Sequence, residues 1–185
     1  MIEEILLEAE DKMDKAIDVA RGDFGDIRSG RANSGMFEKI PVEYYGAMTP
    51  LQQLASITVP EARTVLIQPF DRSAMESIEK ALRESDLGIN PSNDGVVIRV
   101  IMPQLTEERR KEYVRLARSK AEDARVAIRA IRRKGKEDID TLSKDGDVGE
   151  DAAKRAQDEL DSLTKKHTDQ VDSMLEAKEK ELLEV

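Results

Sequence analysis

Arginines spaced three, four and seven residues apart are the side chains with the clearest chemical potential in this sequence. They are Arg115, Arg118, Arg125, Arg129 and Arg132, here called the arginine row. On a helix this spacing places the guanidinium groups along one face. Lys111 and Lys136 extend the row, and Arg133 lies beside it. Guanidinium groups bind phosphates through paired hydrogen bonds and stack on bases, so the row indicates a nucleic-acid contact.

Two interpretations of the arginine row stay open. Like charges at these spacings repel one another and weaken an isolated helix, so a purely structural role predicts more alternation of sign. Glu122 is the only acid in register with the row. Phosphate neutralisation therefore explains the row better. The alternative is that acids on other helices, which are abundant, pair with these arginines.

The remaining reactive residues do not form a recognisable active site. His167 is the only histidine and falls at or near an apolar helical seam, where packed histidines are commoner than catalytic ones. The chain has no cysteine, which excludes disulfides, thiolate ligands and thiol nucleophiles. Residues 145–151 lack the ligand spacing of a calcium loop, and Lys134-Gly135-Lys136 lacks the rest of a phosphate-binding loop. We therefore expect no catalytic residue, no metal site and no cofactor.

The charge is distributed unevenly along the chain. The total is −9, yet residues 106–136 carry 12 basic and 5 acidic groups, a net charge of +7. Residues 1–31, 32–105 and 137–185 carry −4, −3 and −9. The acidic total does not argue against a nucleic-acid partner, because the positive charge is concentrated in the segment that carries the arginine row.

The composition favours a helical protein. With 185 residues and 39% hydrophobic content, the chain can bury a core in one domain or in two small ones. The 3% of aromatic residues against 37% of charged ones favours packed aliphatic helices. No run of about 18 apolar residues occurs, and the acidic, amphipathic start does not resemble a signal peptide. We therefore expect a cytoplasmic protein that makes no membrane contact.

Three segments carry the periodicity of amphipathic helices. The first begins at Ile5 and should end near residues 28–30, where glycine is a typical terminator. The second should cover residues 106–143 without a break, and the third should follow a capping segment at residues 147–150. None of these helices can bury its apolar stripe alone, so all three should pack together.

The segment between Gly30 and Pro103 has a different pattern. Short β-rich runs separated by turn residues predict strands at residues 40–45, 57–59, 63–68 and 96–101. Ser73-Ala-Met-Glu76 has the spacing of a capping box and predicts a helix through about Ser85. Asn93-Asp94-Gly95 predicts a tight turn before the last strand. We interpret this segment as a small α/β module.

The three helices can pack together only if residues 1–30 lie beside residues 104–185, so the module at residues 31–103 must be an insertion. The predicted fold class is α+β, with a long antiparallel three-helix bundle as one domain and the inserted small α/β domain as the other. Two chain connections, near residues 28–31 and 102–104, would join them. Their glycine and proline should permit bending in a limited set of directions.

Six motifs spread along the whole chain form a specific pattern. They are Arg28-Ser-Gly-Arg-Ala-Asn33, Tyr44-Tyr-Gly46, Val59-Pro-Glu-Ala-Arg63, Ser85-Asp-Leu-Gly-Ile-Asn-Pro91, Pro103-Gln-Leu-Thr-Glu-Glu-Arg-Arg110 and Ile128-Arg-Ala-Ile-Arg-Arg133. In this order they resemble the ribosome recycling factors, and the alanine-rich, acidic composition suggests an actinobacterial member. The family pattern has proline where this chain has Ser34, and usually asparagine where it has Ala130. The second departure removes one polar contact that could reach RNA.

The resemblance implies an L-shaped molecule with an outline like transfer RNA. It implies that the bundle binds large-subunit ribosomal RNA near the intersubunit bridges after termination. Elongation factor G, using GTP, would then drive the factor against those bridges and separate the subunits. The implied RNA contacts on the bundle are Arg129, Arg132 and Arg133. We expect a monomer with the ribosome and elongation factor G as its partners.

The resemblance also implies roles for residues near the two connections. Arg28, Arg31, Arg109 and Arg110 would bind RNA near the hinge end. The interdomain hinge itself would comprise Ser29, Gly30, Arg31, Met102, Pro103 and Gln104.

Two other functional classes remain as alternatives to RNA binding. A helical adaptor could dock the arginine row onto an acidic partner helix, and it would show little salt-dependent affinity for ribosomes. A hydrolase could use surface carboxylates, but no pair of them lies in a recognisable pocket motif. Turnover by the isolated protein would favour this second alternative.

Overall fold

The protein, described here from a computed structural model over residues 1–184, divides into two compact units. The first unit contains residues 1–28 and 108–184, and the second contains residues 29–107. The chain therefore leaves the first unit, forms the second and returns. A helical unit interrupted by a small α/β unit is the fold class predicted from the sequence, and it is confirmed.

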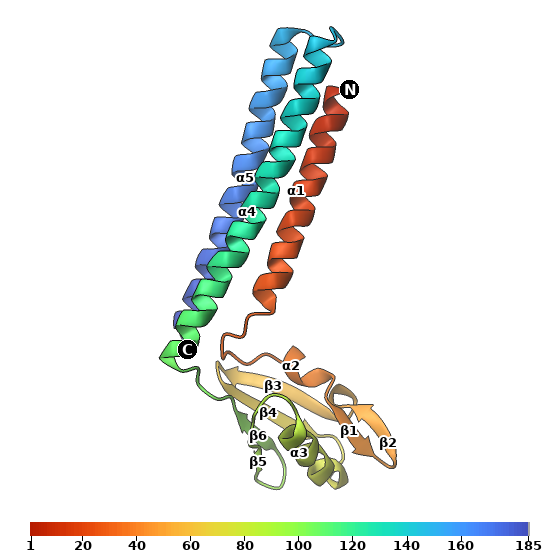
Figure 1. Ribbon diagram of the computed structural model, residues 1–185. Helices are drawn as coiled ribbons and strands as arrows, with labels where there is room; N and C mark the ends of the chain where they lie inside the picture. Colours follow the sequence, from red (N-terminus) through yellow and green to blue (C-terminus); the bar gives the residue numbers. More distant parts are fainter. Residues whose placement is uncertain (185) are drawn as a thin grey trace. The chain divides into compact units, whose positions relative to one another are not determined.

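The first unit is a bundle of three long helices, α1 (Ile2–Gly25), α4 (Glu107–Lys144) and α5 (Glu150–Leu183). They lie side by side, and α4 runs antiparallel to the other two (Figure 1). The predicted long helix is confirmed, because α4 continues without a break over 38 residues. At about 1.5 Å per residue it forms a rod roughly 57 Å long.

The core of the bundle consists mainly of alanine and branched aliphatic side chains. The buried apolar residues of α1 are Ala9, Met13, Ile17, Ala20 and Phe24; those of α4 are Ala117, Ala121, Ala124, Ile128 and Ile139; those of α5 are Ala153, Ala156, Leu160, Val171 and Leu182. Steps of three, four and eleven residues keep each set on one helix face. The small side chains let the helix backbones approach closely, so the bundle forms a narrow, well-packed rod.

Two predicted helix ends in the bundle are wrong. We expected the first helix to end near residues 28–30, but α1 ends at Gly25, and Ile27 donates its N–H to the Phe24 carbonyl in a tighter turn. Gly22 and Gly25 lower helix propensity there, while burial of Ile27 favours the turn over another helical turn. The third helix has Gly149 as its N-cap, without the side-chain cap expected from residues 147–150.

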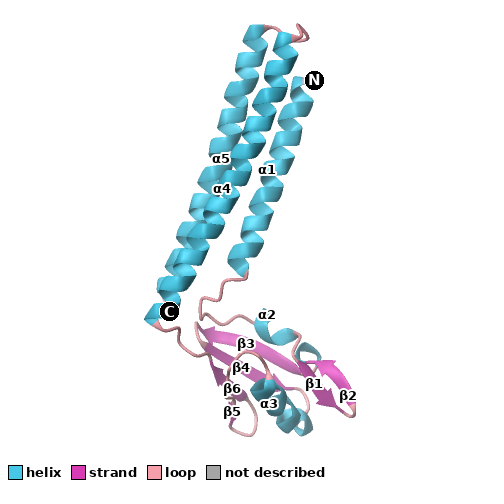
Figure 2. Ribbon diagram, in the orientation of Figure 1, coloured by secondary structure: helices cyan, strands magenta, loops and turns pink. Residues whose placement is uncertain are grey.

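The second unit contains two antiparallel sheets (Figure 2). The hairpin of β1 (Pro41–Tyr44) and β2 (Ala47–Pro50) forms one sheet. The other has the strand order β3-β4-β6-β5, formed by β3 (Ala55–Glu61), β4 (Thr64–Pro69), β6 (Ile98–Ile101) and β5 (Ser92–Asn93). The unit also contains α2 (Gly35–Glu38), α3 (Met75–Glu84) and two short 3-10 turns, Leu51–Gln53 and Arg72–Ala74.

The sequence missed two strands and misplaced one cap in this unit. Pro41 and Pro50 face each other at the open end of the β1–β2 pairing and hide β2, and β5 is only two residues long. The expected capping box at Ser73 does not form, because the Asp71 carboxylate accepts the Ser73 N–H at 2.9 Å and a 3-10 turn precedes α3. The predicted turn at residues 93–95 is confirmed, since the Asp94 side chain accepts the N–H groups of Val96 and Val97.

The second unit has its own core, formed where α3 and the strands pack together. Its fully buried members include Phe37, Val42, Leu51, Val65, Ile67, Ile78, Leu82, Ile98 and Val100. The long strands alternate buried and exposed positions, so one sheet face supplies most of this core. None of the helices over residues 1–184 has a stretch apolar enough to cross a membrane.

Candidate nucleic-acid interface

The unbroken helix α4 positions the whole arginine row. Arg118, Arg125 and Arg132 follow one another at seven-residue steps, about 10.5 Å of helix rise each, and all three reach carboxylates of α5. They therefore lie along the flank of α4 that faces α5. Arg129 bonds within α4 instead, and the Arg115 Nε donates to the Lys111 carbonyl at 3.4 Å.

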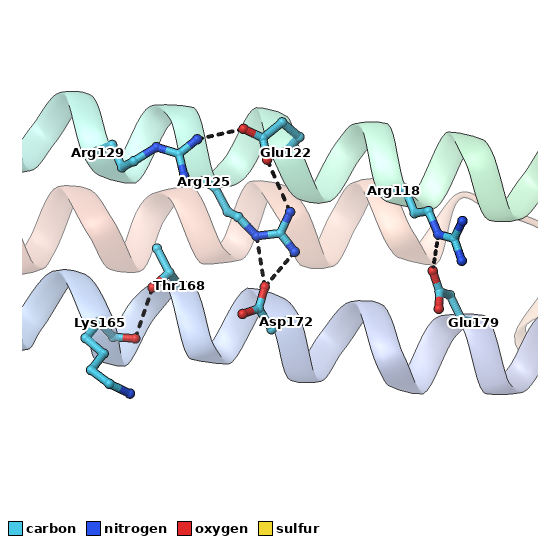
Figure 3. Close-up of polar contacts among 8 residues, drawn as sticks. All are labelled: Arg118, Glu122, Arg125, Arg129, Lys165, Thr168, Asp172 and Glu179. Atoms are coloured by element: carbon cyan, nitrogen blue, oxygen red, sulfur yellow. Dashed lines mark hydrogen bonds and ion pairs between the residues drawn. The ribbon is translucent and has the colours of Figure 1, made fainter.

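Three ion pairs connect the row to α5. The Arg118 Nε donates to Glu179 Oε1 at 2.6 Å. The Arg125 Nε and Nη2 both donate to Asp172 Oδ1, at 2.8 Å and 2.5 Å. Farther along, the Arg132 Nε donates to Asp161 Oδ1 at 2.7 Å. Figure 3 shows the first two pairs, in which each arginine on α4 reaches a carboxylate on α5.

Glu122 connects two members of the row within α4. Its carboxylate accepts from Arg129 Nη2 at 2.6 Å and from Arg125 Nη1 at 3.3 Å (Figure 3). The hydrogen bond from Arg129 is the main cause that lowers the pKa of Glu122. The hydrogen bond to Asp172 is the main cause that raises the pKa of Arg125. These groups are therefore held as a charged network.

The structural alternative left open by the sequence is thus present in the isolated protein, because four of the five arginines in the row have carboxylate partners. Glu122 is the acid in register with the row on α4, and α5 supplies three further acids. Pairs of this kind on a surface stabilise a protein by only about 0–1 kcal/mol, so they remain exchangeable. The side chain of Arg118 is 64% exposed and that of Arg125 is 22% exposed, so the pairs differ in how readily they could open.

One member of the row, Arg115, and two basic residues beside it differ from the paired members. Arg115, Arg133 and Lys136 are exposed, and within residues 1–184 none of them has a carboxylate oxygen within 4.0 Å. Val126, 52% exposed, lies on the same outer part of α4. The outer face of α4 therefore offers unneutralised positive charge beside the ion-paired flank.

The four arginines expected near the hinge end divide between the two units. Arg28, Arg109 and Arg110 belong to the bundle, whereas Arg31 belongs to the second unit. Arg109 pairs with Glu112 at 3.4 Å, and Arg28 and Arg31 have exposed side chains. Arg110 is half-buried, and its Nε is the buried side-chain polar atom without a hydrogen-bond partner among the described residues.

The six predicted hinge residues lie in non-helical chain at the two connections between the units. Gly30 has a φ of +78°, a conformation that residues with a Cβ rarely adopt. Ser29 and Met102 are buried, and the Met102 N–H donates to the Arg63 carbonyl at 2.7 Å. Arg31, Pro103 and Gln104 are exposed. The connections thus contain both anchored and exposed residues.

His167 is a packed residue of the bundle, as its seam position indicated. Its side chain is 1% exposed, its Nδ1 lies 2.7 Å from the Leu163 carbonyl oxygen and its Nε2 lies 2.7 Å from Asp14 Oδ1. The ring thereby connects α5 to α1. Among the described residues, no nucleophile and no acid other than Asp14 is bonded to the ring. The arrangement is therefore that of a structural histidine.

The two departures from the family pattern fall at different places. Ala130 lines a groove of about 260 Å³ between α1 and α4, together with Ile5 and Glu8. It does not lie on the flank that faces α5, so its missing amide leaves the ion-paired arginines unchanged. Ser34 precedes α2 in the second unit.

The residues that sequence reasoning missed are the acids of α5, Asp161, Asp172 and Glu179. The partners in their ion pairs are separated by 29, 47 and 61 residues along the chain. The seven-residue step between Asp172 and Glu179 matches the step between Arg118 and Arg125, and this was the available signal. It could not identify partners, because it does not fix the alignment of the two helices.

Comparisons with known proteins agree with this architecture. The family described as "Ribosome recycling factor" matches residues 20–183. Ribosome-recycling factors of Kineococcus radiotolerans and Renibacterium salmoninarum are each 65% identical to this chain, over 100% of both sequences. Their actinobacterial origin agrees with the composition of this chain.

Two solved structures are similar over nearly the entire chain. A solution structure of the ribosome recycling factor has a TM-score of 0.71 and 43% identity, covering 100% of this chain and 98% of that one. The second has a TM-score of 0.63 and 42% identity, covering 99% of each chain, and is described as models for the T. thermophilus ribosome recycling factor and the E. coli elongation factor G bound to the E. coli post-termination complex. Because the family match, the full-length relatives and the structural similarity coincide, this chain belongs to the ribosome recycling factor family.

Proposed function

We propose that this protein recycles ribosomes after termination. Its bundle binds large-subunit ribosomal RNA near the intersubunit bridges, and with elongation factor G and GTP it promotes dissociation into subunits. The observation that carries this proposal is the full-length similarity to a recycling factor described together with elongation factor G on a post-termination complex. The protein works as a binding and displacement factor, and we assign it no catalytic step and no cofactor.

The surface proposed for RNA is the α4 face that carries the arginine row, Arg133 and Lys136. A continuous helix holds these cations in fixed order along one rod, which suits contact with several phosphates of a folded RNA. Arg115, Arg133 and Lys136 supply charge that carboxylates do not neutralise. Residues 1–31 and 137–185 are acidic, so binding to RNA through other faces of the bundle is opposed by repulsion.

At the proposed hinge, a force applied to one unit changes the direction of that unit relative to the other. The two connections, residues 29–31 and 102–104, are the only covalent paths between the units along the described chain. Two paths allow bending while limiting twist. Arg28, Arg31, Arg109 and Arg110 are proposed to hold RNA close to these connections, so that displacement acts on a bound factor.

Substitution of Arg132 tests the RNA surface. We expect Arg132→Ala to weaken binding to purified large subunits and to lower the slope of log affinity against log salt by about 1, because one phosphate contact is lost. Arg21→Ala is a matched control. Arg21 is also a surface arginine with a single carboxylate partner, Asp18 at 3.1 Å, but it lies on α1.

The binding assay should use sedimentation with large subunits at several salt concentrations. Equal effects of Arg132→Ala and Arg21→Ala would reject the α4 face as the anchor. A salt-independent affinity for subunits would instead favour a protein-binding adaptor. Subunit splitting with elongation factor G and GTP should fall in the Arg132 variant in proportion to its lost binding.

The hinge requires a separate experiment. Gly30→Ala strains a residue with positive φ, so we expect it to impair subunit splitting more than subunit binding. Gly46→Ala imposes the same kind of strain at a φ of +78° in the β1–β2 turn and serves as the control. Splitting that is unchanged in the Gly30 variant would remove this connection from the mechanism.

A further inference from the structure

The acids of α5 occupy the same guanidinium groups that RNA phosphates would use. Asp161, Asp172 and Glu179 each accept at least one hydrogen bond of 2.8 Å or less from an arginine of the row. A carboxylate and a phosphate both accept from the guanidinium fork with similar geometry. In Figure 3 the Asp172 carboxylate lies directly against the Arg125 guanidinium. Glu122 contacts another nitrogen of the same guanidinium, so carboxylates occupy both of its edges.

We propose that Asp161, Asp172 and Glu179 are internal competitors that restrain the arginine row from binding RNA indiscriminately. This inference rests on the proposed function, because it assumes that the row binds phosphate. The acids also hold the arginines extended at seven-residue steps along the flank of α4, so they position the row as well as mask it.

The restraint follows from the small net free energy gained when an arginine exchanges its carboxylate partner for an RNA phosphate. An arginine that already has a carboxylate partner gains only the difference between the phosphate contact and the carboxylate contact. A few scattered contacts then stabilise a complex very little. An RNA surface that presents several phosphates in the right places gains this difference many times over, so the acids raise the number of matched contacts needed for binding.

A purely structural role for the three acids is insufficient to explain their placement. Exposed ion pairs stabilise a fold by at most about 1 kcal/mol, and the bundle already has a continuous buried core. The side chains of Asp161 and Asp172 are 54% and 56% exposed. The carboxylates of Asp161 and Asp172 are therefore accessible to competition from solvent and from polyanions, whereas the side chain of Glu179 is 26% exposed and less accessible.

The experiment compares substitutions that remove the same charge from the same helix. Asp161→Asn, Asp172→Asn and Glu179→Gln each remove one partner of the row. Asp158→Asn and Glu176→Gln are matched controls, since both acids are exposed, lie on α5 and have no Lys, Arg or His nitrogen within 4.0 Å among residues 1–184. The probes are an RNA hairpin of arbitrary sequence and purified large subunits.

We expect each of the three partner substitutions to tighten binding to the hairpin about two- to fivefold relative to its matched control, the range that loss of an exposed ion pair allows. The slope of log affinity against log salt should become steeper by up to about 1 for each freed guanidinium, because that group can then neutralise one more RNA phosphate and release its condensed counterion. The variant with all three substitutions should bind the hairpin roughly tenfold or more tightly if the effects add.

Structural damage is separated from competition by the direction of the change. A loosened bundle would weaken RNA binding and lower the melting temperature, whereas competition predicts tighter binding in a folded variant. The single substitutions keep this test available if the triple variant does not fold. Hairpin affinities and salt slopes equal to those of Asp158→Asn and Glu176→Gln would overturn the inference.

The outcome also distinguishes this inference from the proposed function. If Arg132→Ala weakens subunit binding while the three acid substitutions behave like their controls, the proposed RNA surface is supported and the competition by the acids is rejected. If Arg132→Ala has no effect on subunit binding, the arginine row is not the RNA surface, and the inference fails with it.

Discussion

A Cβ added at Gly135 would lie 3.0 Å from Leu160 Cδ2 and 3.4 Å from its Cδ1, so glycine lets α4 approach the α5 side chain closely. Leu160 is 1% exposed and cannot move into solvent. By helix propensity alone, a glycine inside α4 has only a modest cost. The packing shows that it accommodates a large neighbour at a crowded point of the bundle core.

Gly135→Ala should therefore destabilise the bundle despite the better helix propensity of alanine. Alanine gains about 1 kcal/mol over glycine in a helix, while overpacking against buried side chains costs about 1–3 kcal/mol, so we expect a net loss of about 1 kcal/mol. Chemical denaturation followed by circular dichroism measures this difference. Gly22→Ala is the control, because nothing lies within 4 Å of a Cβ added there, and it should stabilise α1. A Gly135 variant as stable as the Gly22 variant would contradict the packing argument.

The bond between Asp14 and His167 predicts unequal effects of two similar aspartates. Asp14 and Asp11 have side chains that are both 64% exposed, but Asp14 contacts the buried His167 and Asp11 contacts the exposed Lys15. Asp14→Ala leaves a buried ring nitrogen without its partner and should cost about 1–2 kcal/mol. Asp11→Ala breaks an exposed pair and should cost at most about 0.5 kcal/mol. Unfolding free energies that are equal for the two variants would show that the Asp14 contact does not stabilise the bundle.

Ser34 has a backbone conformation that proline can adopt. Its φ is −62° and its ψ is −33°, and along residues 1–184 its N–H makes no hydrogen bond to the protein. Ser34→Pro should therefore stabilise the second unit by about 0.4–1 kcal/mol, because it reduces the freedom of the unfolded chain. Ser34→Ala, which keeps that freedom, should show no such gain. A lower melting temperature for the proline variant would mean that Asn33 cannot accept a following proline.

Asp71 predicts a pH-dependent contribution to the stability of the second unit. The backbone N–H of Ser73 is the first cause that lowers the pKa of Asp71, and the hydroxyl of Tyr44 also donates to it at 2.9 Å. The same hydrogen bond is the main cause that raises the pKa of Tyr44. A carboxyl with a depressed pKa stabilises the fold above its unfolded pKa, and this contribution is lost as the pH falls through the folded value.

Asp71→Asn should therefore lower the melting temperature most near neutral pH. The difference from the unsubstituted protein should shrink as the pH falls from about 4 through the lower folded pKa of Asp71, because both side chains become uncharged there. Asp86→Asn, at an exposed aspartate of the same unit, is the control and should show a smaller difference at neutral pH. A difference that grows toward acid pH would contradict a lowered pKa of Asp71 in the folded protein.

Much of the fold could be predicted from local patterns. The steps of three and four residues through Ala117, Ala121, Ala124 and Ile128 determine which face of α4 is buried, and they need no knowledge of the partner helix. Because the three apolar stripes cannot be buried separately, the helices must pack together. The sequence therefore also predicted that the second unit is an insertion in the helical one. Short elements were less predictable, since β2 and β5 depend on pairing with strands elsewhere in the chain.

Helical spacing is a local property, so the sequence alone places five arginines on one face of a long helix. Helix packing, by contrast, brings Arg125 to Asp172, His167 to Asp14 and Gly135 to Leu160. These partners lie far apart along the chain, and their meeting depends on the alignment of packed helices, which side-chain volume sets across the entire core.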